Sequence, residues 1–203
     1  MMGVKAEALT GGFSSAVFDS QRIFKKLMDG MARPGTPQTI ETAVAPPLPL
    51  AAATGAVLLA LCDHDTPVWL NGALRKTAVP GWIGFHTGAP ATEEKAAAHF
   101  AVIEAGSAIA SFGLFAQGSQ EYPDRSTTLI IELSDLDGGR ELLLSGPGIR
   151  HVNIISPSGL PDIFPMLWAE NNAIFPRGVD VILTAGDKFV CLPRTTRIKP
   201  VEA

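Results

Sequence analysis

The sequence is poor in cysteine, tyrosine and charge. Its 203 residues include 2 cysteines and 1 tyrosine, and 18% are charged, which leaves a formal net charge of -4. Cys62 and Cys191 lie far apart in apolar runs and form no C-x-x-C pair, so we expect two buried thiols of a cytosolic protein. Nucleic-acid binding is disfavoured, because proteins that bind nucleic acids usually carry a basic excess on one face.

The sequence also lacks an apolar run long enough to cross a bilayer, which takes about 20 residues. Three prolines break the longest uncharged stretch, so a continuous helix could extend only from about Leu50 to Cys62. We expect this segment to be a buried core helix. The N-terminal segment has no signal-peptide pattern. These observations predict a cytoplasmic protein that makes no contact with a membrane.

Apolar residues, glycine and proline are abundant. Hydrophobic residues make up 46% of the chain and the mean hydropathy is +0.23, which with the small net charge excludes a disordered chain. The 20 glycines and 16 prolines exceed average usage and indicate many turns. The length suits one domain, which we expect over residues 15–198, with an N-terminal extension at 1–14 and a C-terminal tail at 199–203. The first dozen residues and the tail are expected to be mobile.

The clearest predicted element is an amphipathic helix that begins near Ser15. It ends at Arg33, because Pro34 disfavours the helical conformation of the residue before it, and the helix dipole favours a cation there. The predicted apolar face consists of Phe18, Ile23, Phe24, Leu27, Met28 and Met31. The predicted polar face consists of Asp19, Arg22, Lys25 and Lys26.

Strands and further helices alternate through the rest of the chain. We expect helices at 92–99 and 162–172, and a loose helix or turn-rich segment at 109–115. We expect strands at 66–70, 82–86, 100–103, 127–133, 141–145, 152–155, 179–184 and 188–192. Several strands are continuous apolar runs, which implies a sheet covered by helices on both faces. Gly138-Gly139 and residues 184–187 are short enough for hairpin turns, so the predicted sheet is mixed.

Two short motifs have a structural explanation. Residues 145–148 lack the spacing of a phosphate-binding loop, and Pro147 followed by Gly148 is typical of a type II turn. Residues 63–65 place a histidine between two carboxylates, but His99 and His151 are isolated and no second cluster has ligand spacing. We therefore expect a polar turn after the helix at 50–62, and no metal site.

Residues 115–126 form a long polar connection that contains the single tyrosine. Loops of this length often serve as binding or lid elements, with Tyr122, Asp124 and Arg125 as the candidate residues here. The alternative is a solvated surface loop with a simple turn at Pro123.

The C-terminal part contains the sharpest candidates for a binding site. Arginine offers a planar fork that matches phosphate or carboxylate, and neighbouring threonine hydroxyls can complete an anion site. The candidate residues for binding an anion or a nucleotide are Arg33, Arg177, Asp180, Arg194, Thr195 and Thr196. The alternative is a solvated edge or a subunit contact. The sequence shows no nucleophile elbow and no paired carboxylates, so no catalytic residue is predicted.

Seven blocks, taken together and in order, are similar to the H subunit of the bacterial carbon-phosphorus lyase system, which acts in phosphonate utilisation. They lie between residues 18 and 198 and read FxxLMxxMAxPG at 24–35, DxDTPVWL at 63–70, FHTGAP at 85–90, GGR at 138–140, LSGPGI at 144–149, FPRGVDVIL at 175–183 and PRTT at 193–196. Each block is weak alone, but this order within this length is highly specific.

The resemblance implies a single-domain three-layer α/β/α sandwich with a mixed sheet, similar to the large domain of transferases that depend on pyridoxal phosphate (PLP), but without PLP. It implies a homodimer that works in a core complex with the G, I and J subunits and with an ATP-binding-cassette-like partner. That assembly transfers an alkylphosphonate to the ribose C1′ of ATP with loss of adenine, and a radical subunit then cleaves the carbon-phosphorus bond. The resemblance supplies no catalytic residue for this chain.

Two roles are compatible with these observations. The chain is either a structural and docking subunit of the lyase core, or a subunit that itself binds ATP or a phosphonate. Retained PLP chemistry would need a buried lysine, and Lys76 and Lys188 are the only candidates near strand ends. We expect no cofactor bound by this chain.

Overall fold

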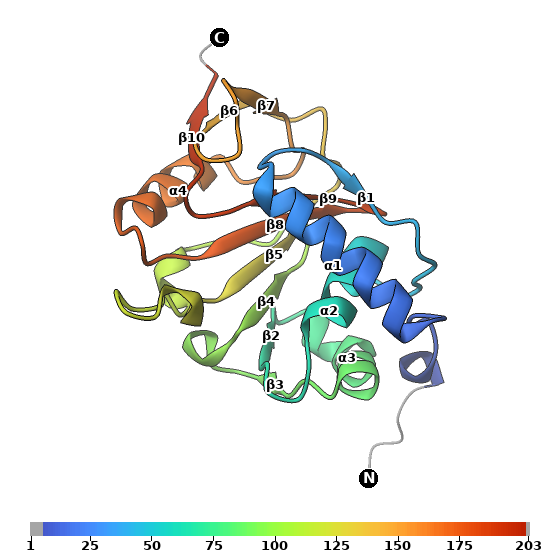
Figure 1. Cartoon of the computed structure of the whole chain (residues 1–203). Helices are drawn as coiled ribbons and strands as arrows, with labels where there is room; N and C mark the ends of the chain where they lie inside the picture. The colour runs from blue at the N-terminus through green and yellow to red at the C-terminus, as the bar shows by residue number, and fades with distance from the viewer. Residues whose placement is uncertain (1–5, 202–203) are drawn as a thin grey trace.

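A seven-stranded mixed sheet forms the centre of the molecule (Figure 1). The computed structural model describes residues 6–201. Across the sheet, the strands run in the order β1 (Gln38–Thr39), β9 (Lys188–Leu192), β8 (Asp180–Ala185), β5 (Thr128–Glu132), β4 (Phe100–Ile103), β2 (Val68–Leu70) and β3 (Ala91–Thr92). The strands from β3 to β8 pair in parallel, whereas β9 pairs antiparallel with both β8 and β1. The predicted α/β class and the mixed sheet are confirmed.

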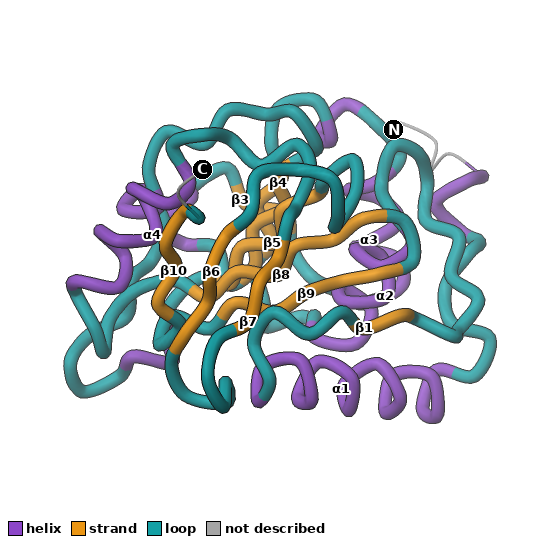
Figure 2. The backbone as a smooth tube through the Cα atoms, turned by 90° about the horizontal axis from the view of Figure 1, so that it is seen from above, coloured by secondary structure: helices purple, strands orange, loops and turns teal. Residues whose placement is uncertain are grey.

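The two faces of this sheet carry different layers. Helices α1 (Ala16–Ala32), α2 (Ala52–Leu61) and α3 (Val79–Thr87) cover one face, as Figures 1 and 2 show from two directions. The other face carries α4 (Phe164–Ala173) and a second sheet of three antiparallel strands. Its strands lie in the order β10 (Arg197–Pro200), β6 (Leu142–Ser145) and β7 (Asn153–Ile155). Helices therefore lie on both faces, but a small sheet completes the second layer.

Alternating side chains of the central strands enter two separate cores. Ile130 and Ile182 pack with the α1–α3 layer, which contains the buried Trp82. Their neighbours Leu129 and Val181 pack on the opposite face, where further core residues come from α4 and the small sheet. Successive side chains of a strand point to opposite faces, so a strand that is covered on both sides must be apolar throughout. This confirms the interpretation of the continuous apolar runs for β5 and β8, whereas Leu143 in the apolar run of β6 is only partly buried.

Helix α1 has the predicted bounds but buries a different face. It ends at Arg33, whose backbone N–H donates to the carbonyls of the last turn. Ile23 and Leu27 are buried with Asp19 and Gly30, whereas three residues of the predicted apolar face are largely exposed: Phe18, Phe24 and Met28. The placement of Asp19 on the polar face was therefore wrong. A Cβ atom at Gly30 would lie 2.9 Å from Cys191 Sγ, so close approach to β9 fixes which side of the helix faces inward.

Three other local predictions were wrong. Residues 82–86 lie in α3 and not in a strand, because a short apolar run does not distinguish a strand from a buried helix. Residues 92–99 contain only the end of β3 and one 3₁₀ turn at Lys95–Ala97. Gly138-Gly139 joins β5 to β6, which belong to different sheets, so it is not a hairpin turn. The turn at 184–187 does join the antiparallel pair β8 and β9, as predicted.

Most other predicted elements agree with the structure. The buried helix, the helix near 162–172 and the remaining strands are present with boundaries shifted by a few residues, and 109–115 contains the short 3₁₀ helix Phe112–Leu114. No helix among residues 6–201 is long and apolar enough to cross a membrane.

The chain ends that the structure describes are packed against the domain. A 3₁₀ helix at Ala6–Leu9 lies beside α3, and Trp82 Nε1 donates a hydrogen bond to the Thr10 carbonyl at 2.8 Å. At the other end β10 pairs with β6, and the Val201 backbone N–H donates to the Glu141 carbonyl. The mobility expected for these segments stays a prediction. The predictions for residues 1–5 and 202–203 lie outside the described residues.

Candidate functional site

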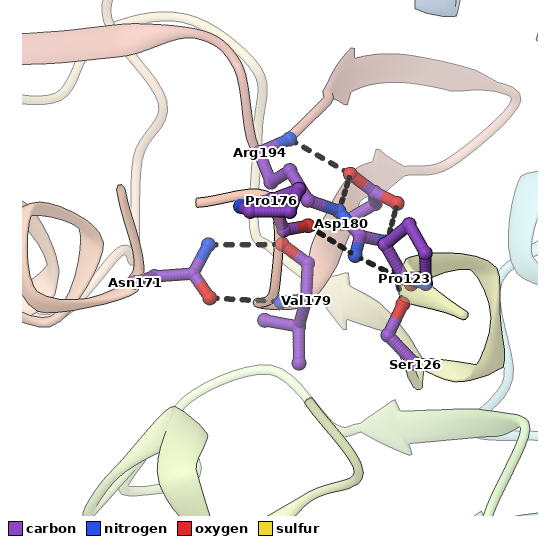
Figure 3. Close-up of polar contacts among 7 residues, drawn as sticks. All are labelled: Pro123, Ser126, Asn171, Pro176, Val179, Asp180 and Arg194. Carbon is purple, nitrogen blue, oxygen red and sulfur yellow. Dashed lines mark hydrogen bonds and ion pairs between the residues drawn. The ribbon is translucent and has the colours of Figure 1, made fainter. Parts of the chain in front are cut away.

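Arg194 and Asp180 form a polar clamp at the edge of the central sheet where the parallel strands β5 and β8 begin and the antiparallel strand β9 ends (Figure 3). Arg194 Nε and Nη2 donate to the two carboxylate oxygens of Asp180, and the Arg194 backbone N–H also donates to Oδ1. Nη1 donates to the Pro123 carbonyl at 2.8 Å, and Nη2 donates to Ser126 Oγ. All three guanidinium nitrogens therefore have partners within the protein. The pair links β8 and the β9–β10 connection to the loop at 115–126, and it offers no open anion site.

Helix α4 fixes the backbone on both sides of this clamp. Asn171 Nδ2 donates to the Val179 carbonyl and Oδ1 accepts from the Val179 N–H, at 2.9 and 2.8 Å, as Figure 3 shows. Asn172 Nδ2 donates to the Arg194 carbonyl at 2.9 Å, and Trp168 Nε1 donates to the Thr196 carbonyl at 2.7 Å. These bonds satisfy backbone groups that no strand partner reaches. The segment from Arg194 to Thr196 is therefore held rigidly.

A cavity of about 270 Å³ lies beside this segment, and we call it the Arg197 cavity. It is lined by Pro147, Asn172, Phe175, Thr195 and Arg197. The lining comes from the end of α4, the start of β10 and the turn at 145–148. That turn has the predicted type II geometry, with Gly148 at φ 81° and a hydrogen bond from the Ile149 N–H to the Gly146 carbonyl.

The structure disperses the predicted anion-binding residues. Only Thr195 lines the Arg197 cavity. Thr196 is fully buried, and Arg33 is exposed at the end of α1, where its guanidinium lies 3.4 Å from Asp29. Arg177 is exposed in the turn after α4. Sequence reasoning missed Asn172, Phe175 and Arg197, although Arg197 stands in the same Arg-Thr-Thr-Arg motif.

The loop at 115–126 is fixed at several points. Besides the two bonds from Arg194, the Gly178 N–H donates to the Gln117 carbonyl at 2.8 Å. The Arg125 guanidinium stacks over the Tyr122 ring, 4.2 Å from its centroid, and both side chains are exposed together with Asp124. These anchors favour the surface-loop alternative over a lid, and the three candidate residues form no enclosed site.

Glu132 is a buried carboxyl group that sequence reasoning also missed. It ends β5, and its Oε1 accepts a hydrogen bond from the Ala51 backbone N–H at 2.7 Å, at the start of α2. Burial raises the pKa of this carboxyl above its usual range, against the opposing effect of the Ala51 bond. A charged residue that ends an apolar strand was the available signal. Because Glu132 accepts a hydrogen bond at the N-terminus of α2, its role is to cap that helix.

The cysteines and the polar turn have structural roles. Burial raises the pKa of both Cys62 and Cys191 to about 12, which keeps the thiols protonated and unreactive. The Asp65 N–H donates to Asp63 Oδ1 at 2.9 Å, so residues 63–66 form the expected polar turn. Among residues 6–201, no three His, Cys, Asp or Glu side chains gather in an arrangement that could hold a metal ion.

The outer face of α1 exposes an apolar stripe, which we call the α1 stripe. Val17, Phe18, Phe24 and Met28 are each at least half exposed. Exposed apolar side chains that recur on one helix face, as Val17, Phe24 and Met28 do at spacings of seven and four residues, are typical of an interaction site, whereas scattered single residues are not. This stripe is the feature of the structure that best fits contact with another protein.

Comparison with known proteins gives a consistent result. The family model described as bacterial phosphonate metabolism protein (PhnH) matches residues 11–199. The chain is 52% identical over 198 residues to the alpha-D-ribose 1-methylphosphonate 5-triphosphate synthase subunit PhnH of Rhizobium meliloti, covering 98% of this chain and 99% of that protein. It is also 41% identical over 81 residues to a protein of Stutzerimonas stutzeri named as a C-P lyase subunit protein, HtxG, covering 40% of this chain and 42% of that protein.

Proposed function

Because this chain belongs to the PhnH family of bacterial phosphonate metabolism proteins, we propose that it is a subunit of alpha-D-ribose 1-methylphosphonate 5-triphosphate synthase. The identity to the Rhizobium meliloti subunit over nearly the full length of both chains supports this function. In that assembly the chain has a scaffold and docking role. The enzyme complex transfers an alkylphosphonate to the ribose C1′ of ATP and releases adenine.

The α1 stripe is the observation that carries the docking role. Val17, Phe24 and Met28 are spaced seven and four residues apart and so share one exposed face of α1, with the exposed Phe18 about 100° further round the helix. A partner that covers Phe24 and Met28 would remove apolar surface from water, and this burial is favourable by about 25 cal/mol of free energy per Å². Of the residues that the sequence suggested for anion binding, Arg194 and Asp180 are engaged with each other in the clamp.

Several finer properties belong to the same proposal. The chain forms a homodimer, works in the cytoplasm, and assembles with the G, I and J subunits of the carbon-phosphorus lyase core. Its fold is a three-layer sandwich related to the large domain of PLP-dependent transferases. PLP itself does not fit, because Lys76 and Lys188 are both exposed and neither supplies the buried lysine that PLP chemistry needs.

Complementation tests the proposed function. The chain is expressed in a Rhizobium meliloti strain that lacks its own PhnH subunit, with methylphosphonate as the sole source of phosphorus. We expect growth to be restored, and the chain to co-purify with the other subunits of the synthase. Failure to grow, with the chain expressed and folded, would contradict the proposal.

A paired substitution tests the α1 stripe. The double variant Phe24→Ser and Met28→Ser is expected to fold normally but to lose co-purification and growth. Leu48→Ser is the control, because Leu48 is 86% exposed but lies outside α1. Equal assembly of the double variant and the control would show that the stripe is not the docking surface.

A further inference from the structure

We propose that the Arg197 cavity binds the phosphorus oxyanion of a small organic ligand, a phosphate ester or a phosphonate. In the complete site the apolar part of the ligand lies against Phe175 and Pro147. The inference depends on the proposed function only for the choice of probes. Binding to the isolated chain is a separate property from assembly with other subunits.

Arg197 supplies the charge. It is the first residue of β10 and its side chain is exposed, yet among residues 6–201 it forms no ion pair. Arg194, three residues earlier, has all its guanidinium nitrogens engaged. Arg197 is thus the arginine of the Arg-Thr-Thr-Arg motif whose planar fork is free for a ligand. That fork matches two oxygens of a phosphate or phosphonate.

The other lining groups suit an anion that carries hydroxyl groups. The Thr195 hydroxyl can donate to a phosphorus oxygen, and no aspartate or glutamate lines the cavity to repel a negative charge. Asn172 uses Nδ2 on the Arg194 carbonyl, which leaves its amide oxygen to accept from a ligand hydroxyl. Phosphorylated ribose offers both kinds of group.

The walls are apolar and fixed. Phe175 is 57% exposed, which is unfavourable for a free aromatic side chain but suits a surface for an apolar ligand face. Gly146 lies so close to the connection before β10 that a Cβ atom there would be 3.0 Å from the Thr195 carbonyl oxygen. The turn that carries Pro147 is therefore packed against the Thr195 backbone, and α4 holds the same backbone through Asn172 and Trp168. A preformed site loses less entropy on binding.

The size of the cavity limits the ligand. A volume of about 270 Å³ lies just below the roughly 300–1,000 Å³ of sites for drug-sized molecules. It suits a sugar phosphate or the phosphate-bearing part of a nucleotide better than a large cofactor.

Calorimetry on the full chain tests the inference with four probes: ATP, ribose 5-phosphate, methylphosphonate and inorganic phosphate. We expect ribose 5-phosphate or ATP to bind more tightly than inorganic phosphate, because they contact the apolar wall as well as Arg197. Methylphosphonate as the tightest probe would assign the cavity to the phosphonate substrate. Absence of binding by all four probes would overturn the inference.

Variants locate the binding. Arg197→Gln is expected to lower the affinity for the tightest probe by roughly 10-fold to 100-fold, because the variant loses hydrogen bonds to a charged group. Lys188→Gln removes the same charge at the far end of β9 and should leave the affinity unchanged. Circular dichroism confirms that both variants are folded. If Arg197→Gln binds as tightly as the wild type, the oxyanion does not lie in this cavity, whether or not the chain restores growth.

Discussion

Arg194 and Asp180 are joined at three points. The Arg194 backbone N–H and Nε both donate to Asp180 Oδ1, at 2.7 and 3.1 Å, and Nη2 donates to Oδ2. Asp180 begins β8 and Arg194 follows the end of β9, so the pair closes the hairpin opposite its turn. The same guanidinium holds the loop at 115–126 through Pro123 and Ser126. One side chain therefore joins three segments that are distant in sequence.

This geometry predicts a large coupling energy between the two residues. In a double-mutant cycle of Arg194→Gln and Asp180→Asn, we expect about 2 kcal/mol, because both side chains are largely buried. Urea denaturation measures the free energies of unfolding. The exposed pair of Lys25 and Asp29 is the control and should give about 0.5 kcal/mol or less. Similar couplings in both cycles would contradict a structural role for the clamp.

Two glycines with nearly the same positive φ should differ in their tolerance of alanine. Gly148 and Gly138 have φ values of 81° and 82°. A Cβ atom at Gly148 would lie 2.2 Å from the Ala32 carbonyl oxygen, whereas nothing lies within 4 Å at Gly138. We expect Gly138→Ala to cost about 1 kcal/mol of stability for the left-handed conformation alone. Gly148→Ala should cost clearly more, and equal melting temperatures would refute the close approach of this turn to α1.

Glu132 should destabilise the fold as the pH rises. Its pKa in the folded protein is raised above the usual value by burial, so the folded state holds the proton more tightly than the unfolded chain. The favourable contribution of protonated Glu132 to the free energy of unfolding is complete at a pH below its pKa in the unfolded chain. This contribution is lost as the pH rises through the pKa of Glu132 in the folded protein. Glu132→Gln keeps an acceptor for the Ala51 N–H, so the stability of this variant relative to wild type should increase from acidic to neutral pH. A constant difference in melting temperature would contradict this.

Asp19 should show the opposite pH dependence. The Ser15 backbone N–H and the Arg22 side chain hold the pKa of this carboxyl below its usual range. The contribution of ionised Asp19 to the free energy of unfolding is present at a pH above its pKa in the unfolded chain. This contribution is lost as the pH falls through the pKa of Asp19 in the folded protein. Asp19→Asn should therefore melt at a lower temperature than wild type at neutral pH, with a difference that shrinks in acid. A difference in melting temperature that grows in acid would show that folding does not lower the pKa of Asp19.

The buried face of α1 can be tested with neighbouring residues. Ile23 is fully buried and Phe24 is half exposed. We expect Ile23→Ala to cost about 3 kcal/mol of unfolding free energy, since it leaves a cavity against α2 and β9. Phe24→Ala should cost less than about 1 kcal/mol in the isolated chain. If Phe24→Ala were the more destabilising change, the helix would be rotated relative to this structure.

Much of the fold could be predicted because it depends on local chemistry. Pro34 ends α1, Gly148 after Pro147 makes the type II turn, and the apolar runs of β5 and β8 indicate strands that are covered on both faces. The candidate site was harder to predict. Arg194 and Arg197 stand in one motif and look equivalent in sequence. In the structure Arg194 is paired with Asp180, whereas Arg197 lines a cavity.

Residue order, periodicity and the conformations that proline and glycine permit were enough to predict the family, the α/β class, most helices and strands, and the turn at 145–148. Only the tertiary structure decided which face of α1 is buried, which arginine remains free, and where Glu132 lies. The reason is physical: burial and pairing depend on what distant segments place against a residue. Gly30 lets α1 approach Cys191 closely, and Asp180 pairs with the Arg194 guanidinium. The end of α4 and the turn at 145–148 complete the lining of the Arg197 cavity.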